Sequence, residues 1–165
     1  TPDEGRGFTL VSDGDGVADP ELSASQIDDM EFYLAELGAP QRKNPTDLGV
    51  LRGEVLFEEV GCAKCHVPSL MGANGPVNLY SDLLLHDVMP GTYRGMAETG
   101  APAGFFRTTP LWGASESAPY MHDGSAETIQ QAIKMHDGEA AGVRAAYNAL
   151  DGLEKRALVG FVLDL

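Results

Sequence analysis

The sequence predicts an all-α domain with long irregular loops and a helical appendage at its N-terminal end. Four stretches repeat apolar residues every three or four positions, as amphipathic helices do: residues 26–38, 46–60, 125–136 and 151–165. Between residues 67 and 125 the chain instead holds Gly, Pro and short apolar pieces without a sustained period. So much loop is unusual in a compact domain unless something besides helices supplies the core.

The sequence Gly61-Cys62-Ala63-Lys64-Cys65-His66 indicates what that core contains, and it holds the chain's only 2 cysteines. Thiols three positions apart can form thioethers with the two vinyl groups of a haem, and the adjacent imidazole then ligates the iron. A dithiol redox pair would need a βαβ context, and a zinc site would need a second pair of ligands. We therefore expect one covalent haem c on Cys62 and Cys65, with His66 as an iron ligand.

Composition limits the functions to consider. With 165 residues, 43% of them hydrophobic, the chain can build one ordinary core, and no apolar run is long enough for a membrane span. The net charge of -14, to which haem propionates would add, makes nucleic acid and anionic membrane surfaces poor partners. A redox partner that is locally basic suits the negative electrostatic field of this chain better.

Covalent haem attachment takes place outside the bacterial cytoplasm, so we expect a periplasmic or otherwise exported protein. The sequence Thr1-Pro2-Asp3-Glu4 is not a positively charged leader, and we expect the chain to be a processed or trimmed product.

Residues 1–44 are expected to form an acidic loop and a helix ahead of a haem domain spanning residues 45–165. Asp13, Asp15 and Asp19 resemble the ligands of a calcium loop, with oxygen donors at alternate positions. However, Val11 takes the first ligand position of that pattern and Leu22 replaces its bidentate glutamate. An acidic turn leading into the helix is the preferred interpretation, with calcium as the alternative.

The helix over residues 26–38 has Ser23 or Ser25 as its N-cap and Gly38 as its C-cap. Its apolar face consists of Ile27, Met30, Leu34 and Leu37. Residues 40–45 then form a polar linker.

The next helix starts from Thr46 or Asp47 and leads into the haem motif. Its predicted inward residues are Leu48, Leu51, Val55 and Leu56. The order G-x-x-x-F-x-x-x-G-C-x-x-C-H, starting at Gly53, resembles the first helix of the class I cytochrome c fold. That resemblance implies close packing against the last helix, for which Asp151 and Glu154 offer a capping box. The predicted face of the last helix consists of Leu153, Ala157, Phe161 and Leu165, with Leu158 and Val162 beside it.

The irregular middle section is expected to wrap the haem. The candidates for this contact are Leu79, Tyr80, residues 83–85, Phe105, Phe106, Leu111 and Trp112. Ordinary core packing without a cofactor is the alternative for each of them. Arg107 and Tyr120 are expected near the ring, where a guanidinium or a phenol hydrogen-bonds a propionate; the alternative is a solvated surface Arg107 and a half-buried Tyr120. A backbone carbonyl near Pro68 is expected to accept from His66.

The second iron ligand has several candidates. They are His86, His122, His136, Met71, Met89, Met96, Met121 and Met135. In a helix capped by Ser125, His136 continues the apolar stripe of Ile129, Ala132 and Ile133, whereas Met135 falls on the polar side. His136 is therefore the preferred ligand, with Met135, Met121, Met96 or an open position as alternatives.

Several motifs together resemble one family, the bacterial di-haem oxidoreductases of the thiol oxidoreductase type, which are related to the di-haem cytochrome c peroxidases and to MauG. The motifs are residues 13–21, 61–68, 80–87, 106–113 and 118–124. In the peroxidases the sixth ligand of the electron-transfer haem lies on the helix after the last motif, which implies His136 here, or Met135 after a shift of one position. The resemblance covers the C-terminal haem region, and the chain departs from it by having one C-x-x-C-H motif instead of two.

Three functions follow from these expectations. A closed, six-coordinate iron favours an electron-transfer domain. A vacant iron face with His122, His86 or Arg107 nearby would favour a peroxidase-like or oxidase-like enzyme. A haem-based sensor is the third class, and no sequence feature favours it.

Overall fold

The computed structural model describes residues 22–89, 91 and 94–165. It divides the chain into two compact units, Thr1–Gly38 and Ala39–Leu165. The proposed calcium ligands Asp13, Asp15 and Asp19 lie outside the described residues. A domain boundary between residues 44 and 45 stays a prediction; residues 39–45 belong to the second unit, where Arg42 and Asn44 both hydrogen-bond to Asp164.

In the first unit, helix α1 (Ala24–Glu36) begins with a capping box in which Ser23 and Gln26 bond each other's backbone. The helix ends at Leu37, whose extended backbone stops it, so the prediction that Gly38 is the C-cap was wrong. None of the α1 side chains is buried.

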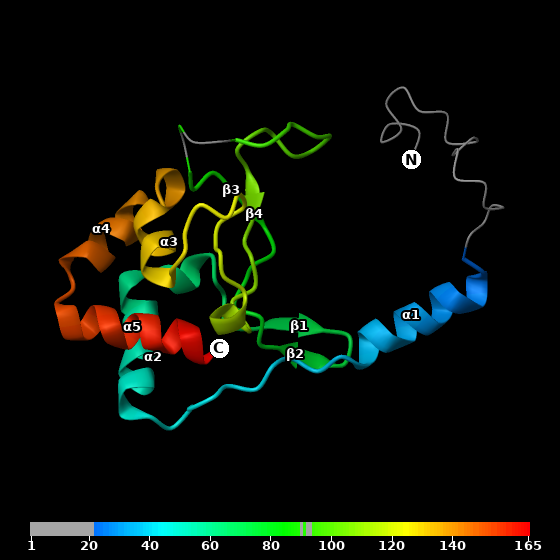
Figure 1. Ribbon diagram of the computed structural model, residues 1–165, viewed down its shortest axis with the longest axis horizontal. Helices are drawn as coiled ribbons and strands as arrows, with labels where there is room; N and C mark the ends of the chain where they lie inside the picture. Colours follow the sequence, from blue (N-terminus) through cyan, green and yellow to red (C-terminus); the bar gives the residue numbers. More distant parts are fainter. Residues whose placement is uncertain (1–21, 90, 92–93) are drawn as a thin grey trace. The chain divides into compact units, whose positions relative to one another are not determined.

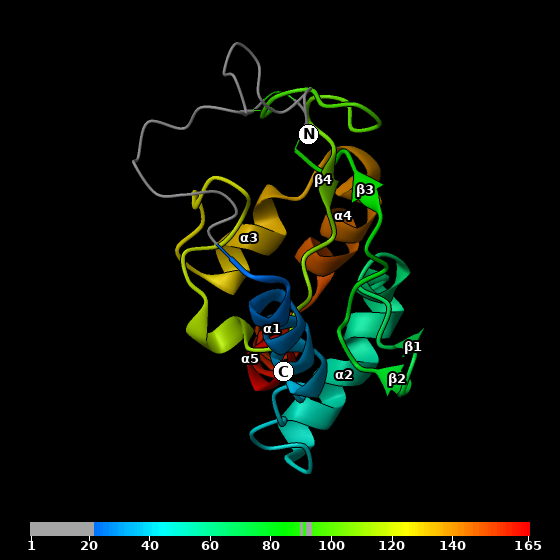
Figure 2. The ribbon, with the colours of Figure 1, turned by 90° about the vertical axis from the view of Figure 1, so that its right-hand side faces the viewer.

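The second unit is mainly helical, with two short antiparallel strand pairs (Figures 1 and 2). Its elements are α2 (Leu48–Val60), η1 (Cys62–Lys64), β1 (Leu70–Gly72), β2 (Gly75–Val77), β3 (Leu85–His86), β4 (Phe106–Arg107), η2 (Ala114–Glu116), α3 (Ile129–Met135), η3 (Gly138–Ala140), α4 (Ala141–Ala149) and α5 (Gly152–Asp164). This composition is consistent with a cytochrome c-like fold. Among the described residues, no helix is both long and apolar enough to cross a membrane.

Helix α2 is bounded by strong local signals. The Asp47 carboxylate accepts hydrogen bonds from the backbone N–H groups of Gly49 and Val50, which satisfies two free donors of the first turn. At the other end Gly61 adopts a left-handed conformation with φ 99°, which a residue with a side chain rarely adopts. The helix therefore ends at Val60, and Gly61 alone separates it from Cys62.

Helices α2 and α5 cross at close range, as the resemblance to cytochrome c implied (Figure 1). A Cβ atom at Gly53 would collide with the carbonyl oxygen of Ala157 and lie 2.7 Å from Cβ of Phe161. One turn later the rings of Phe57 and Phe161 pack edge to face, with centroids 5.2 Å apart. The missing side chain at Gly53 thus lets the two helices touch.

The crossing also corrects the predicted helix faces. The buried residues of α2 are Gly53, Leu56, Phe57 and Val60. Leu48, Leu51 and Val55 are exposed, as is Leu153 at the start of α5. Two crossing helices meet over only part of their length, so the whole apolar stripe of each does not reach the contact.

The hydrophobic core lies where α2 and α5 meet the loops. Its buried members are Leu56, Phe57, Val60, Tyr80, Ala114, Ile129, Tyr147, Leu158, Phe161, Val162 and Leu165. Tyr80 and Ala114 come from the irregular section, so this section packs onto the helices just beside the cysteine motif.

Candidate haem site

The cysteine motif occupies a tight turn directly after α2. The short helix η1 begins at Cys62, and Cys65 is its C-cap. The N–H of His66 donates to the carbonyl oxygen of Cys62 at 3.0 Å. Both thiols are free and half-buried. Burial raises the pKa of Cys62 to about 11, and burial with nearby carboxylates raises the pKa of Cys65. A dithiol redox pair needs the opposite shift, because it depends on a stabilised thiolate.

His66 is oriented by the loop that follows it. Its Nδ1 lies 3.0 Å from the carbonyl oxygen of Tyr80, so the N–H is placed on Nδ1 and Nε2 keeps its lone pair. Burial lowers the pKa of His66 to about 4, despite the opposing effect of this hydrogen bond. A neutral imidazole with a free Nε2 is the form that binds a metal. The predicted acceptor near Pro68 was wrong: the N–H of Tyr80 donates to Pro68, and Tyr80 itself accepts from His66.

Tyr80 is held in an unusual backbone conformation by its packing. Its φ of 54° is left-handed, which costs about 1 to 2 kcal/mol for a residue with a side chain. The ring packs edge to face on Phe57 and Phe161, with centroid distances of 6.2 and 5.8 Å. The helical core therefore fixes the carbonyl that orients His66.

His136 has the same kind of hydrogen bond as His66. It follows the last residue of α3, and its Nδ1 lies 2.7 Å from the carbonyl oxygen of Ala132. Burial lowers the pKa of His136, so this imidazole is neutral too and presents Nε2. Burial is the main cause of the lowered pKa of His66, and the charge that His136 would carry when protonated lowers it further. The N-cap of α3 is Thr128, which forms a capping box with Gln131; the prediction of Ser125 was wrong.

The other ligand candidates are placed less favourably or are engaged elsewhere. Met71 and Met96 are among the most exposed apolar side chains, whereas Met89 is buried. His122 is exposed and its ring stacks on Phe106 with a centroid distance of 3.8 Å. Met121 and Met135 are half-buried, and the Met135 sulfur lies 3.9 Å from the Ser125 hydroxyl.

The two predicted propionate partners lie in different parts of the fold, one on a strand and one in the loop before α3. Arg107 is exposed on β4, and the Tyr120 hydroxyl donates to the carbonyl oxygen of Ala114 at 2.7 Å. Of the residues expected to wrap the ring, Leu79 and Tyr80 are buried, whereas Leu83, Leu84 and Leu85 are exposed.

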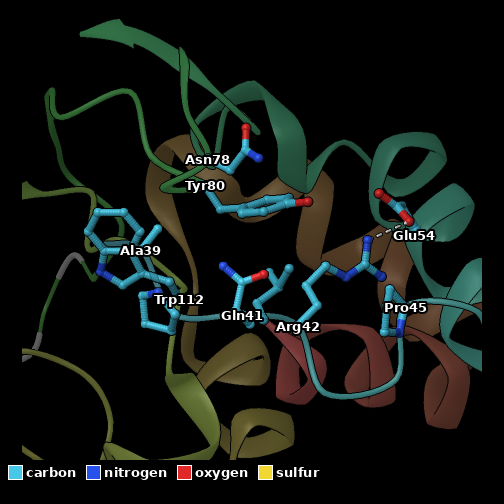
Figure 3. A pocket seen from close by; sticks show the side chains of 10 residues that line it. Ala39, Gln41, Arg42, Pro45, Glu54, Asn78, Tyr80 and Trp112 are labelled. Carbon is cyan, nitrogen blue, oxygen red and sulfur yellow. Dashed lines mark hydrogen bonds and ion pairs between the residues drawn. The ribbon is translucent and has the colours of Figure 1, made fainter. Parts of the chain in front are cut away.

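Trp112 and Tyr80 both line a cavity of about 480 Å³ (Figure 3). Arg42 lies beside this cavity and donates to Glu54 at 3.1 Å and to Asp164 at 2.8 Å. Its guanidinium carbon also sits 5.2 Å from the centre of the Phe161 ring. None of the lining residues belongs to the cysteine motif, so the structure places Trp112 beside this cavity and not in the haem-attachment turn.

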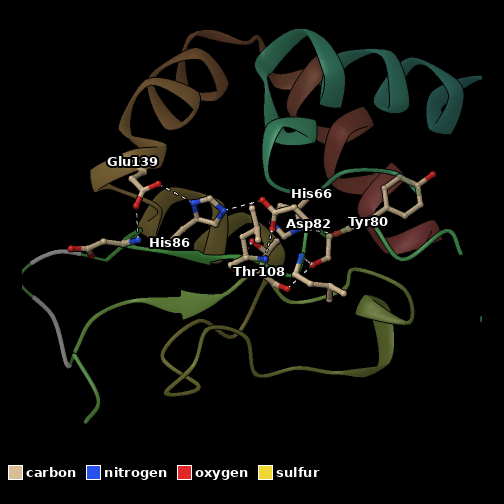
Figure 4. A network of polar contacts seen from close by, with 10 residues as sticks. His66, Tyr80, Asp82, His86, Thr108 and Glu139 are labelled. Carbon is tan, nitrogen blue, oxygen red and sulfur yellow. Dashed lines mark hydrogen bonds and ion pairs between the residues drawn. The ribbon is translucent and has the colours of Figure 1, made fainter. Parts of the chain in front are cut away.

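A polar network beside Cys65 was not expected from the sequence (Figure 4). His86 lies between the carboxylates of Asp82 and Glu139, with one ring nitrogen 2.9 Å from each. Hydrogen bonds to Glu139 and Asp82 raise the pKa of His86, which favours the imidazolium. Cys65, Asp82 and His86 offer ligand atoms within 4.8 Å of one another, but haem attachment would use the Cys65 sulfur. The i, i+4 spacing of Asp82 and His86 was the one available sequence signal; Glu139 comes 53 residues later.

The residues present fit a c-type haem. Two protonated thiols lie at the required spacing, and two neutral imidazoles have Nδ1 committed to a backbone carbonyl. Cys62, Cys65, His66 and His136 are thus the residues that would hold the group.

Comparisons with known proteins agree with this chemistry. The family model described as "Di-haem oxidoreductase, putative peroxidase" matches residues 5–165. The hydrazine synthase of Kuenenia stuttgartiensis is 22% identical with a TM-score of 0.61, and the match covers 98% of this chain and 60% of that chain. A MauG-like protein associated with microbial copper homeostasis is 23% identical with a TM-score of 0.48, covering 72% of this chain and 47% of the other. No curated protein sequence matches significantly.

The chain therefore spans about 60% of the hydrazine synthase chain, and at this identity the likeness concerns the fold alone. The family match extends over nearly the whole sequence and includes every motif described above. The chain belongs to the di-haem oxidoreductase family of haem proteins.

Proposed function

We propose that this chain is a c-type cytochrome electron-transfer domain in which loops wrap one covalent haem on a class I cytochrome c-like scaffold. Cys62 and Cys65 would hold the haem through thioethers, and Nε2 of His66 and of His136 would complete a six-coordinate iron. The observation that carries this proposal is the matched pair of Nδ1 hydrogen bonds, because each one leaves Nε2 as the metal-binding nitrogen.

The geometry of the chain suits electron transfer. The haem supplies an iron that gains or loses one electron. Both imidazoles are neutral before they bind metal, so ligation requires no proton release at neutral pH. The acceptors on Tyr80 and Ala132 restrain the two half-buried rings, and a restrained ligand pair would change little in position when the iron changes charge.

The net charge and the cysteine motif also bear on the redox partner and the cellular compartment. The net charge of -14 favours a redox partner that is basic where it docks. Covalent haem attachment favours the periplasm or another exported space. We propose one haem for this chain, because its sequence contains one C-x-x-C-H motif.

A peroxidase-like enzyme is the second candidate, and the family description names that activity. Such chemistry needs a vacant iron face with a polar group beside it. The position of His136 favours the electron-transfer proposal, since the hydrogen bond from its Nδ1 already orients this half-buried imidazole as a ligand.

The His136→Ala variant tests the ligand assignment. We expect the ferric wild type to give a low-spin bis-histidine paramagnetic resonance spectrum, and the variant to keep its covalent haem but become high-spin. Met135→Ala is the matched control and should stay low-spin. A high-spin wild type would favour the peroxidase-like enzyme, and an unchanged His136→Ala spectrum would refute His136 as the ligand.

A further inference from the structure

The turn after His136 is fastened to the end of strand β3 by backbone hydrogen bonds. The N–H of Asp137 donates to the carbonyl oxygen of Val88 at 2.6 Å, and the N–H of Glu139 donates to that of Asp87 at 3.1 Å. Strand β3 is itself fixed by its pairing with β4, where Leu85 lies opposite Arg107. The segment that carries His136 is thus attached to a second, separate element.

The Glu139 side chain adds two more bonds at the same place. Its Oε1 accepts from the N–H of Asp87 at 2.9 Å, and its Oε2 lies 2.9 Å from Nδ1 of His86. The Glu139 carboxylate therefore binds both the imidazole of His86, on β3, and the backbone N–H of Asp87, which follows that strand. Figure 4 shows Glu139 above His86, with Asp82 on the other side of the ring.

The same chain of hydrogen bonds continues to the haem-attachment motif. Nε2 of His86 lies 2.9 Å from Asp82, and the N–H of Asp82 donates to the carbonyl oxygen of Cys65 at 2.8 Å. Polar contacts thus run from Cys65 through Asp82, His86 and Glu139 to the turn that follows His136.

Helix α3 alone gives His136 little support. It has 7 residues, and helices this short are marginal in water without tertiary contacts. His136 lies beyond its last residue, in an extended backbone conformation with ψ 127°. The position of the imidazole therefore depends also on what holds the turn behind it.

We propose that His86 and Glu139 form a clamp that positions His136 against the iron and slows its release. This inference rests on the proposed function, because it takes His136 as the sixth ligand. Both are positioning residues: they act on the turn that carries the ligand. Their loss raises the population of a state in which His136 has left the iron.

The rate of cyanide binding to the ferric holoprotein measures that opening, because cyanide binds only after His136 leaves. Glu139→Ala removes both hydrogen bonds of the Glu139 carboxylate, those with His86 and with the N–H of Asp87. It should accelerate cyanide binding about tenfold or more. His86→Ala removes the ring but leaves the bond between Glu139 and Asp87, so its effect should be smaller. Glu139→Gln keeps an acceptor for Asp87 and should restore most of the wild-type rate.

Glu127→Ala is the matched control, since it removes one exposed carboxylate just before α3 and outside the clamp. Its cyanide rate should stay within about twofold of wild type, because surface substitutions usually change stability little. Urea unfolding of each variant separates local opening from global stability. A structural role alone would lower the free energy of unfolding without a rate increase at zero urea.

The outcomes separate the two proposals. If His136→Ala turns the iron high-spin but Glu139→Ala and His86→Ala bind cyanide no faster than Glu127→Ala, the clamp is refuted and the function stands. If His136→Ala leaves the spectrum unchanged, the ligand assignment itself fails. Should Glu139→Ala yield no haem protein, His86→Ala decides the question by the same comparison with Glu127→Ala.

Discussion

The two histidines proposed as iron ligands are oriented by the same kind of bond, made to different parts of the molecule. His66 uses the carbonyl of Tyr80, 14 residues later in an irregular loop. His136 uses the carbonyl of Ala132, one turn earlier in its own helix. The first bond depends on tertiary packing, and the second is local.

This difference predicts which side of the haem opens first. The Tyr80 ring packs against both Phe57 and Phe161, so disturbing its carbonyl means disturbing the contact of α2 with α5. His136 can move when a short helix and one turn move. Regions with few buried contacts open at lower free energy than the core, so the His136 side should exchange ligands and the His66 side should not.

The sharpest way to break this comparison is to replace each ligand by glycine and add imidazole. We expect His136→Gly to keep its covalent haem and regain a low-spin absorption spectrum with millimolar imidazole, because the core still holds the other side. His66→Gly should yield almost no haem protein, with or without imidazole. Equal recovery of both variants would show that the two sides are equivalent.

The next largest effect is expected at the helix crossing. Gly53→Ala places a methyl group against the Ala157 carbonyl and Phe161, and overpacking of this kind should cost about 1 to 3 kcal/mol in the free energy of unfolding. Gly160→Ala, in the same helix pair, meets nothing within 4 Å and should stabilise by up to about 1 kcal/mol. Urea unfolding of the two variants measures both changes. If the two substitutions changed the free energy of unfolding in the same direction, the close approach at Gly53 would be contradicted.

The parts that the sequence predicts well depend on neighbours along the chain. The Asp47 cap, the capping box of Asp151 with Glu154, and the C-x-x-C-H spacing are all confined to a few residues. The close approach at Gly53 was also expected, because the order of Gly53 and Phe57 resembles the first helix of the class I cytochrome c fold.

The parts that could not be predicted depend on tertiary geometry. The crossing of α2 and α5 decides that Leu48 is exposed and Phe57 is buried, although both are apolar members of one helix. The acceptor of His66 requires Tyr80 in a left-handed conformation, which tyrosine itself disfavours. Glu139 meets His86 across 53 residues, and no local pattern reports such a contact.

The smallest expected effect concerns the pH dependence of stability at the His136 side of the proposed haem site. The bonds from His86 to Glu139 and Asp82 raise its pKa in the folded state above the unfolded value of about 6.5. The imidazolium binds its proton more tightly when folded, so its stabilisation is complete below about pH 6.5 and is lost as pH rises through the folded-state pKa. Urea unfolding of wild type and His86→Ala should therefore differ most near about pH 6 and least near about pH 9. The dependence should weaken in Glu139→Gln, which removes one of the two carboxylate charges facing the ring. A difference that grows with pH would mean that the neutral ring is the form held between these carboxylates.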